Sequence, residues 1–427
     1  MNLYEARAKR TQAFLSDRFG MFIHWGLYAI PARGEWVRSN ERISNAEYQK
    51  YFDEFDPVRY DPKKWARLAK EAGMKYAVMT AKHHDGFCLF DSQYTDYKAT
   101  NTKAKRDLIA EYVDAFRAEG IKIGFYYSLI DWHHPDYPHY GDWFHPMRDN
   151  EDFKDTAHDF DNYIRYMHAQ VEELVTNYGK IDIMWFDFSY GDMYGEKWNA
   201  TELVRMIRSH QPNIIIDNRL CGDGMEMKIS ELTEITGDFD SPEQIIPSEG
   251  ITDSSGRAIP WEACITLNEH WGYAMRDKSY KSAKTVVRTL VACVSKGGNM
   301  LLNVGPSAKG DIPKESAAIL REVGEWMYEN AESIYNAGKA KLDKPEWGYY
   351  TQKGSTLYAH VFDKVIGGYR FGGLQGKIES ARLVADGAEL PLDRPWNSAK
   401  YPNDAFIYLD EGDLPNGIDT VIALELL

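Results

Sequence analysis

The chain has 427 residues, enough for one large domain and a smaller one, and its net charge is −15. The acidic residues are spread along the chain, which argues against binding to nucleic acid or to an anionic membrane. Aromatic residues make up 14% of the sequence. This content suits a large core, and it also suits a site in which flat rings stack against the C–H faces of sugars.

Targeting signals are missing from the residues given. Residues 1–14 contain no apolar signal-peptide core, and no apolar run is long enough to span a membrane. The four cysteines lie far apart without CxxC spacing, which indicates buried thiols rather than disulfides or a zinc site. We therefore expect a cytoplasmic protein, with a secretion signal that has been removed as the alternative.

Short apolar strands alternate with helical patterns over the first three quarters of the chain. The expected strands are residues 21–26, 76–79, 122–128, 181–188, 214–217, 234–238, 261–267 and 300–304. The expected helices are residues 45–55, 61–72, 106–119, 152–177, 197–210, 281–294 and 314–334. Continuous apolar strands are typical of a parallel sheet covered on both faces. Eight of them predict an α/β fold, a (β/α)8-like TIM barrel of regular or irregular form, over residues 1–338.

The pattern changes in the last part of the chain. Short β-type runs, separated by Gly, Pro and Asp, occupy residues 347–351, 356–362, 377–384, 405–409 and 420–426. They predict a small antiparallel β-sandwich domain over residues 339–427.

Polar and aromatic residues gather where the predicted barrel strands end. These positions hold His24, Trp25, His83, His84, Asp85, Tyr126, Tyr127, Trp185, Asp187, Asn218, Arg219, Asp238, Asp240, Glu243 and Asn303. A single residue of this kind is more often structural than functional. Because the carboxyl ends of barrel strands form the active-site rim, their joint placement there favours a catalytic site.

The residue types at this rim fit hydrolysis of a polyhydroxylated substrate. A retaining glycosidase needs a nucleophilic carboxylate and a proton-donating carboxylic acid about 5–5.5 Å apart. Asp187 beside a cation such as Arg219 would stay ionised. A glutamic acid on a partly desolvated loop could keep its proton to neutral pH.

A catalytic metal is the competing interpretation, since His83 and His84 are followed by a loop, residues 131–146, that contains four more histidines. Adjacent residues of a strand point to opposite faces, and neither HxH nor HExxH spacing occurs. We therefore expect no metal. The loop is interpreted as an aromatic-rich rim that could touch the leaving group.

Eight blocks of the sequence resemble, in order, the motif blocks of the α-L-fucosidases of glycoside hydrolase family 29. They are RFGMFIHWGLYAIPARGEW, AKHHDGF, GFYYSLIDW, MWFDF, DNR, GDFDSPEQ, WEACITLNEHWGY and SKGGNMLLNVGP, between residues 18 and 306. The resemblance implies an exo-acting retaining enzyme without cofactors, which releases terminal α-L-fucose from oligosaccharides or glycoconjugates through a covalent fucosyl-enzyme. A homo-oligomer is compatible with it, as are transfucosylation and a non-catalytic glycan-binding role.

The resemblance also implies roles for individual residues. Asp187 in MWFDF falls on the nucleophile of the family, and Glu243 in GDFDSPEQ is the best match to the acid/base. Glu262 in WEA matches a family motif but is interpreted as structural, and weaker acid/base candidates are Glu196, Glu231, Glu234 and Glu249. The sugar-binding positions fall on His24, Glu35, Trp36, His83, His84, Tyr127, Trp185 and Arg219. An apolar wall for the methyl group of fucose is expected from Trp271, with Tyr273, Phe22 and Phe87.

Overall fold

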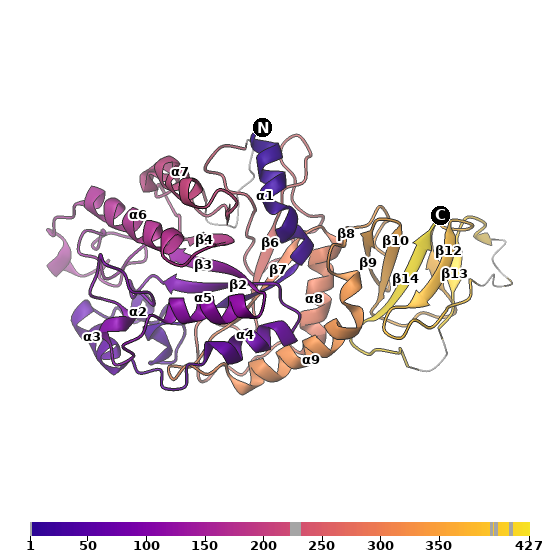
Figure 1. The fold of residues 1–427 in the computed structure, drawn as a ribbon, viewed down its shortest axis with the longest axis horizontal. Helices are drawn as coiled ribbons and strands as arrows, with labels where there is room; N and C mark the ends of the chain where they lie inside the picture. Colours follow the sequence, from indigo (N-terminus) through magenta and orange to yellow (C-terminus); the bar gives the residue numbers. More distant parts are fainter. Residues whose placement is uncertain (1, 223–231, 393–395, 397–399, 410–412) are drawn as a thin grey trace.

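A computed structural model describes residues 2–222, 232–392, 396, 400–409 and 413–427 (Figure 1). Over these residues, the central sheet has seven parallel strands in the order β5-β4-β3-β2-β1-β7-β6. They are β1 (Phe19–Ile23), β2 (Tyr76–Lys82), β3 (Lys122–Ser128), β4 (Ile183–Asp187), β5 (Ile215–Ile216), β6 (Glu262–Thr266) and β7 (Asn299–Val304). The α/β barrel architecture predicted from the alternating strands and helices is confirmed.

The barrel is irregular at its sixth position. Isolated parallel bridges, Asp217 with Phe239 and Asp240 with Trp261, join β5 to β6 there. The regular strand predicted at residues 234–238 is therefore wrong. The physical reason is that the carboxylate of Asp238 accepts the amide N–H of Ile216 at 2.9 Å, so a side chain takes part of the place of a main-chain ladder.

The described helices lie around the sheet, at its amino end and in its connecting loops (Figure 1). They are α1 (Leu3–Asp17), α2 (Val37–Asn40), α3 (Asn45–Glu54), α4 (Pro62–Glu71), α5 (Leu108–Ala118), α6 (Phe160–Thr176), α7 (Ala200–His210), α8 (Ala283–Ser295) and α9 (Lys314–Asn330). Single 3-10 turns are η1 (Leu27–Ala29), η2 (Ala99–Asn101), η3 (Glu151–Phe153), η4 (Gly195–Trp198) and η5 (Ala331–Ser333). Figure 1 shows α6 and α7 on one side of the strands, with α4, α5 and α9 on the other.

Several helices differ from the sequence pattern, among them the short α2, which the pattern does not predict. Helix α6 begins at Phe160 rather than at residue 152, because the side chain of Asp159 caps it by accepting the N–H of Asn162 at 3.0 Å. Helix α1, which the pattern does not predict, carries Phe14 to the amino end of the barrel. The ring centroid of Phe14 lies 4.8 Å from that of Phe239.

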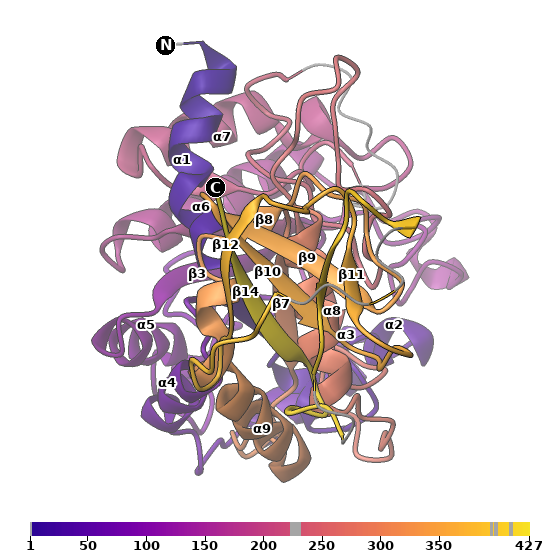
Figure 2. The same ribbon diagram turned by 90° about the vertical axis from the view of Figure 1, so that its right-hand side faces the viewer.

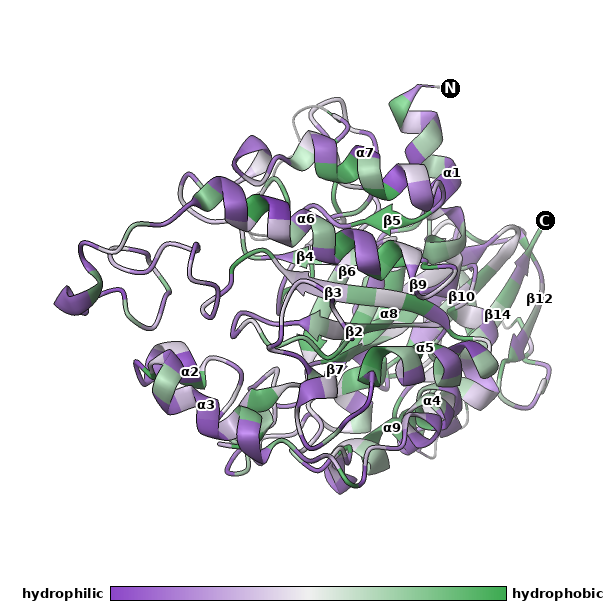
Figure 3. Ribbon diagram, turned by 60° about the vertical axis from the view of Figure 1, so that its left-hand side comes forward, coloured by the Kyte–Doolittle hydropathy of each residue, from purple (hydrophilic) through white to green (hydrophobic). Residues whose placement is uncertain are grey.

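Side chains alternate along the strands between the barrel interior and the helices. The interior cluster includes Phe22, Val78, Tyr126, Ile183, Trp185 and Leu301. Their strand neighbours, such as Met21, Ala77, Phe125 and Met184, belong to the core under the helices. Figure 3 shows these apolar strands enclosed by helices of mixed polarity. No helix in the described ranges is both long and apolar enough to cross a bilayer.

In the C-terminal part, the described residues form two antiparallel sheets. One has the order β12-β14-β10-β9-β8, formed by β8 (Gly338–Lys339), β9 (Gly348–Lys353), β10 (Thr356–Val361), β12 (Ile378–Leu383) and β14 (Thr420–Leu426). The other pairs β11 (Tyr369–Phe371) with β13 (Ala405–Ile407). Residues from both sheets share one apolar core, as expected of a small sandwich, which Figure 2 shows beside α8. The domain boundary at residue 338 stays a prediction.

Candidate active site

A cavity of about 390 Å³ lies at the carboxyl ends of the parallel strands. It is lined by Phe22, His24, Glu35, Trp36, His83, His84, Tyr126, Trp143, Phe144, Trp185, Asp187, Phe188, Tyr190, Gly191, Arg219, Glu243, Cys264 and Trp271. The two predicted catalytic carboxylates and all predicted sugar-binding residues except Tyr127 are among them, as are Trp271 and Phe22 of the predicted apolar wall. A larger hollow of about 630 Å³, beside residues 269–279, touches neither Asp187 nor Glu243, so we place the chemistry in the smaller cavity.

Arg219 joins the two carboxylates of the cavity. Its Nη1 donates to Asp187 Oδ1 at 2.9 Å, and its Nη2 donates to Glu243 Oε2 at 3.1 Å. Because one guanidinium lies against both groups, the carboxylates face the same space although they are distant in sequence. Retaining glycosidases hold their carboxylates about 5–5.5 Å apart, a separation that a single bridging guanidinium readily accommodates.

The two carboxylates differ in environment. The Asp187 side chain is 14% exposed, whereas that of Glu243 is 33% exposed. Burial raises the pKa of Asp187 to about 6; Arg219 opposes this increase, Glu243 adds to it, and the Tyr126 hydroxyl, which donates at 2.7 Å, also opposes it. Asp187 is therefore ionised above about pH 6. Burial disfavours the charge of Arg219, but the two carboxylates give its pKa a net increase.

Ser241 holds Arg219 in this position. The Arg219 Nε donates to Ser241 Oγ at 3.0 Å, and Nη2 also donates to the Ser241 carbonyl at 3.1 Å. Ser241 in turn donates its hydroxyl to Asn218 Oδ1 at 2.9 Å. The guanidinium lies over the Trp185 ring, 4.7 Å from its centroid. Ser241 lies within the GDFDSPEQ block, but no local pattern marks it as a partner of Arg219.

Two histidines present fixed acceptors to the cavity. The Ser128 hydroxyl donates its one proton to the Ile130 carbonyl at 2.7 Å, so His84 Nδ1, which lies 2.7 Å from Ser128 Oγ, is the donor in that contact. His24 Nδ1 likewise faces Asn303 Oδ1 at 2.7 Å. Burial lowers the pKa of both rings, that of His24 to about 3. Both rings are therefore neutral, and each keeps an unprotonated Nε2 that can accept a bond from a sugar hydroxyl.

His83 and His84 lie side by side, with ring centroids 4.0 Å apart. The prediction that they point to opposite faces is wrong, because β2 ends at Lys82 and strand alternation does not extend to them. Within the described ranges of the chain, no group of three or more His, Cys, Asp and Glu side chains is placed to hold a metal ion.

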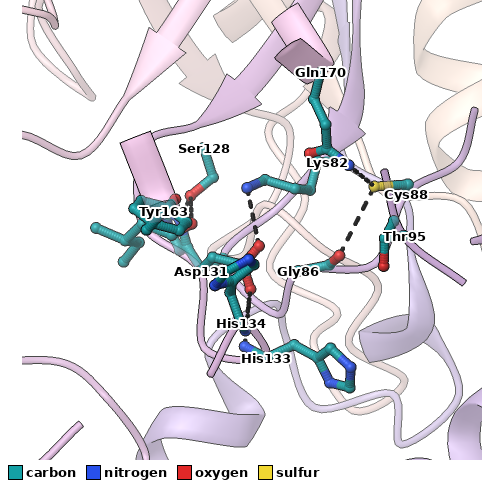
Figure 4. A network of polar contacts seen from close by, with 12 residues as sticks. Lys82, Gly86, Cys88, Thr95, Ser128, Asp131, His133, His134, Tyr163 and Gln170 are labelled. Carbon is teal, nitrogen blue, oxygen red and sulfur yellow. Dashed lines mark hydrogen bonds and ion pairs between the residues drawn. The ribbon is translucent and has the colours of Figure 1, made fainter. Parts of the chain in front are cut away.

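A buried ion pair between Lys82 and Asp131 supports the loop that carries His133 and His134 (Figure 4). Lys82 Nζ donates to Asp131 Oδ2 at 3.1 Å, and these side chains are 0% and 1% exposed. Asp131 Oδ1 also accepts the amide N–H groups of His133 and His134, both at 2.9 Å. A buried ion pair is favourable only when its remaining hydrogen-bonding atoms are satisfied in this way.

Asp131 lies where the loops after β2 and β3 meet. The Trp132 N–H donates to the His84 carbonyl at 2.8 Å, directly beside Asp131. Gly86, at φ +80°, makes this approach possible, since a Cβ there would lie 2.3 Å from Asp131 Oδ1. The Lys82–Asp131 pair therefore holds the backbone that carries His84.

Tyr127 does not reach the cavity. It is fully buried on the outer face of β3, where its hydroxyl donates to Gln170 Oε1 at 2.8 Å on α6. Its neighbour Tyr126 occupies the inner face and donates to Asp187. Two consecutive tyrosines in GFYYS leave the inward residue undetermined until the strand register is known. The structure places Tyr126 at the cavity, in place of the predicted Tyr127.

Of the residues predicted for the apolar wall, two line the cavity and two do not. Trp271 and Phe22 line the cavity with ring centroids 5.8 Å apart, and Glu35 accepts the Gly272 N–H at 2.8 Å. Burial raises the pKa of Glu35. Phe87 instead packs in the core under the helices, and Tyr273 does not line the cavity.

Loop aromatics complete the wall. Trp36, predicted from the sequence, lies with its ring centroid 5.2 Å from that of Phe188. Phe144 and Tyr190 pack against Phe188 at 4.8 and 5.7 Å. The aromatic content of residues 143–144 and 188–190 was the available signal for these contacts, but their positions depend on loop conformation.

Glu262 lies at the opposite end of the barrel. It is the first residue of β6, is 0% exposed, and accepts a hydrogen bond from the Tyr76 hydroxyl. Burial raises the pKa of Glu262 to about 8. Its placement supports the structural interpretation.

The weaker acid/base candidates do not line the cavity in the described part of the chain. Glu234 pairs with Arg205 at 2.9 Å, Glu249 pairs with Lys339 at 3.5 Å, and Glu196 accepts from the Thr201 hydroxyl. Glu231 lies outside the described residues.

Replacing Tyr126 with Phe is expected to lower kcat/KM about tenfold or more, because a hydrogen bond to a charged group contributes about 1.5–3 kcal/mol. Tyr126 favours the ionised form of Asp187, so its removal should also move the acidic limb of the kcat/KM profile, set near pH 6 by Asp187, to higher pH. A pH series of initial rates measures both effects. Tyr127→Phe is the matched control and should leave the acidic limb in place. A shift of the limb in Tyr127→Phe but not in Tyr126→Phe would show that Tyr127, and not Tyr126, acts on Asp187.

Paired carboxylates are the groups with which retaining enzymes cleave glycosidic bonds, and here they lie on the rim of a parallel barrel, bridged by Arg219. The fold and this geometry place the protein among the glycoside hydrolases.

Residues 3–332 match the family described as Alpha-L-fucosidase, and the chain belongs to that family, glycoside hydrolase family 29. It is 64% identical to the structure of α-L-fucosidase isoenzyme 1 from Paenibacillus thiaminolyticus, with 99% of this chain and 100% of that chain covered and a TM-score of 0.97. A family 29 α-L-fucosidase from Bacteroides thetaiotaomicron, solved as a trapped covalent intermediate with 2-fluoro-fucosyl fluoride, is 31% identical over 98% of this chain and 96% of that chain, with a TM-score of 0.84. The human plasma α-L-fucosidase is 29% identical over 347 residues, which are 75% of this chain and 68% of that protein. The family resemblance seen in the sequence is confirmed.

Proposed function

We propose that the protein is an exo-acting α-L-fucosidase that hydrolyses terminal α-L-fucose from oligosaccharides or glycoconjugates with retention of configuration. The observation that carries the proposal is the Arg219 bridge between Asp187 and Glu243 in the cavity at the strand ends. Membership of the α-L-fucosidase family supports the identity of the sugar.

The proposed reaction has two displacements. Asp187 attacks C1 of the fucosyl residue while Glu243 transfers a proton to the departing oxygen, so the glycosidic bond breaks as the fucosyl–enzyme ester forms. Glu243 then takes a proton from a water molecule, whose oxygen attacks C1 and releases Asp187. Arg219 stabilises the charge of Asp187 before attack and after release, and its contact with Glu243 keeps the two groups together.

The walls of the cavity fit a 6-deoxy sugar. The Nε2 atoms of His24 and His84 offer acceptors to hydroxyl groups, as derived from their hydrogen bonds. Trp271 and Phe22 offer an apolar surface to the methyl group. We propose these four side chains, with Glu35, His83, Trp36, Tyr126, Trp185 and Arg219, as the fucose-binding set.

Hydrolysis of an aryl α-L-fucoside, followed by NMR of the first-formed sugar, tests the proposal. The expected result is α-L-fucose that later mutarotates; initial β-L-fucose would exclude double displacement. Absence of turnover with this substrate would favour a glycan-binding role on the same scaffold. Transfer to an added acceptor sugar would appear as a fucosyl product beside free fucose.

We also propose that activity needs no metal or organic cofactor. The carboxylates and Arg219 supply the nucleophile, the proton and the charge stabilisation within one cavity. Dialysis against EDTA is therefore expected to leave kcat unchanged, and loss of activity that a divalent cation restores would contradict this. A cytoplasmic location and assembly of identical chains stay predictions from the sequence.

A further inference from the structure

Trp143 is the exposed aromatic residue of the cavity wall. Its side chain is 62% exposed, although it lines the same cavity as Asp187 and Glu243. The other aromatic residues described in that wall are buried or half-buried, like Trp185 at the base, which is 2% exposed. Trp143 therefore marks the mouth of the cavity.

The loop that carries Trp143 is held by hydrogen bonds on both sides of this residue. Asp142 Oδ1 accepts the N–H groups of Phe144 and His145 at 2.8 and 2.6 Å. The Ser39 hydroxyl donates to the Phe144 carbonyl at 2.6 Å. Tyr190 donates to the other oxygen of Asp142. These hydrogen bonds hold the loop in a conformation that keeps the Trp143 indole exposed.

The indole also rests on the loop that follows the nucleophile strand. A Cβ at Gly191 would lie 3.3 Å from the Trp143 six-membered ring, so the glycine allows close contact. The ring centroids of Trp143 and Tyr190 are 5.6 Å apart. These contacts fix the orientation of the indole relative to the strand end that carries Asp187.

An exposed tryptophan forgoes about 25 cal/mol for each Å² of apolar surface left in water, so a ligand that covers its face gains that free energy. A fucosyl residue bound with C1 at Asp187 must direct its leaving group away from the base, past the half-exposed Glu243 and toward the mouth. Resting on the proposed function, we propose that Trp143 stacks against the apolar C–H face of the leaving-group pyranose. Trp143 is thus a specificity-determining residue of a leaving-group subsite.

The same subsite serves an acceptor sugar. A sugar that attacks the fucosyl–enzyme follows the reverse path of the leaving group, so it must occupy the same place. Trp143 therefore raises the share of fucosyl groups that are transferred to sugars instead of water.

The test compares two substrates in Trp143→Ala and Trp143→Phe. α-L-Fucosyl fluoride has no ring in its leaving group, whereas the best substrate from a panel of fucosyl disaccharides of different linkage has one. Trp143→Ala is expected to lower kcat/KM for the disaccharide about tenfold, equivalent to about 1.4 kcal/mol, and to change that for the fluoride less than about twofold. Trp143→Phe should recover part of the loss. Transfer to an added disaccharide acceptor should fall in parallel.

Tyr194→Ala is the matched control, since Tyr194 is 55% exposed but does not line the cavity. It should leave both substrates unaffected. Equal losses of Trp143→Ala on both substrates would show that the indole supports only the site itself, and no loss on either would show that the leaving group does not touch it; both results overturn the inference. Failure of the unchanged enzyme to hydrolyse the fluoride would instead reject the proposed fucosidase activity, so the two failures are distinct.

Discussion

Replacing Asp187 with Ala is expected to reduce turnover of an aryl α-L-fucoside by about 10⁴-fold or more, the scale seen when a nucleophile is removed. The reason is geometric: Asp187 is the carboxylate that Arg219 and Tyr126 hold at the end of β4, and no other described carboxylate takes both contacts. Steady-state kinetics measure the loss, and thermal unfolding checks that the variant folds.

The stereochemistry of azide addition sharpens this test. In the Asp187→Ala variant, azide can enter the space left by the carboxylate and attack C1 from that face, which would give β-L-fucosyl azide with inverted configuration. Asp182→Ala is the matched control, because Asp182 lies just before the same strand and donates no group to the cavity; its carboxylate accepts the Ile123 N–H at 3.0 Å. Near-normal turnover of Asp187→Ala would reject its role.

Replacing Glu243 with Ala should have a different signature. General acid–base catalysis contributes about 10²–10⁴-fold, so substrates with poor leaving groups, such as fucosyl disaccharides, should lose activity on that scale. Fucosyl fluoride needs little protonation and should form the fucosyl–enzyme at near-normal rate. Azide should then attack C1 of this intermediate and release the fucosyl group as α-L-fucosyl azide, with retained configuration. This product is the opposite anomer to that expected from Asp187→Ala.

Glu262→Gln separates the two acid/base candidates. Glu262 is at the amino end of β6, away from the cavity, so its amide variant is expected to lose stability rather than to gain a response to azide. Formation of α-L-fucosyl azide by Glu262→Gln, with none from Glu243→Ala, would transfer the acid/base role to Glu262.

Motif order and strand pattern in the sequence were sufficient for most of the site. Asp187, Glu243 and Arg219 could be grouped because the ends of parallel strands share one rim, and the structure brings all three together. Tyr126 and Tyr127 could not be separated in this way. Which of two neighbouring tyrosines faces inward depends on the register of β3 against β2 and β4, which the whole sheet determines.

The sequence by itself determined the parallel barrel, the C-terminal sheets and the set of polar residues at the strand ends, since these follow from local periodicity and chain order. Only the tertiary structure decided the contacts among loops: His83 beside His84, Ser241 on Arg219, and Trp143 at the mouth of the cavity. Loop conformation depends on partners far away in the chain, such as Asp131 on Lys82 or Asp142 under Tyr190. Local sequence patterns do not specify these long-range pairs, so the positions of the loops could not be predicted from the sequence.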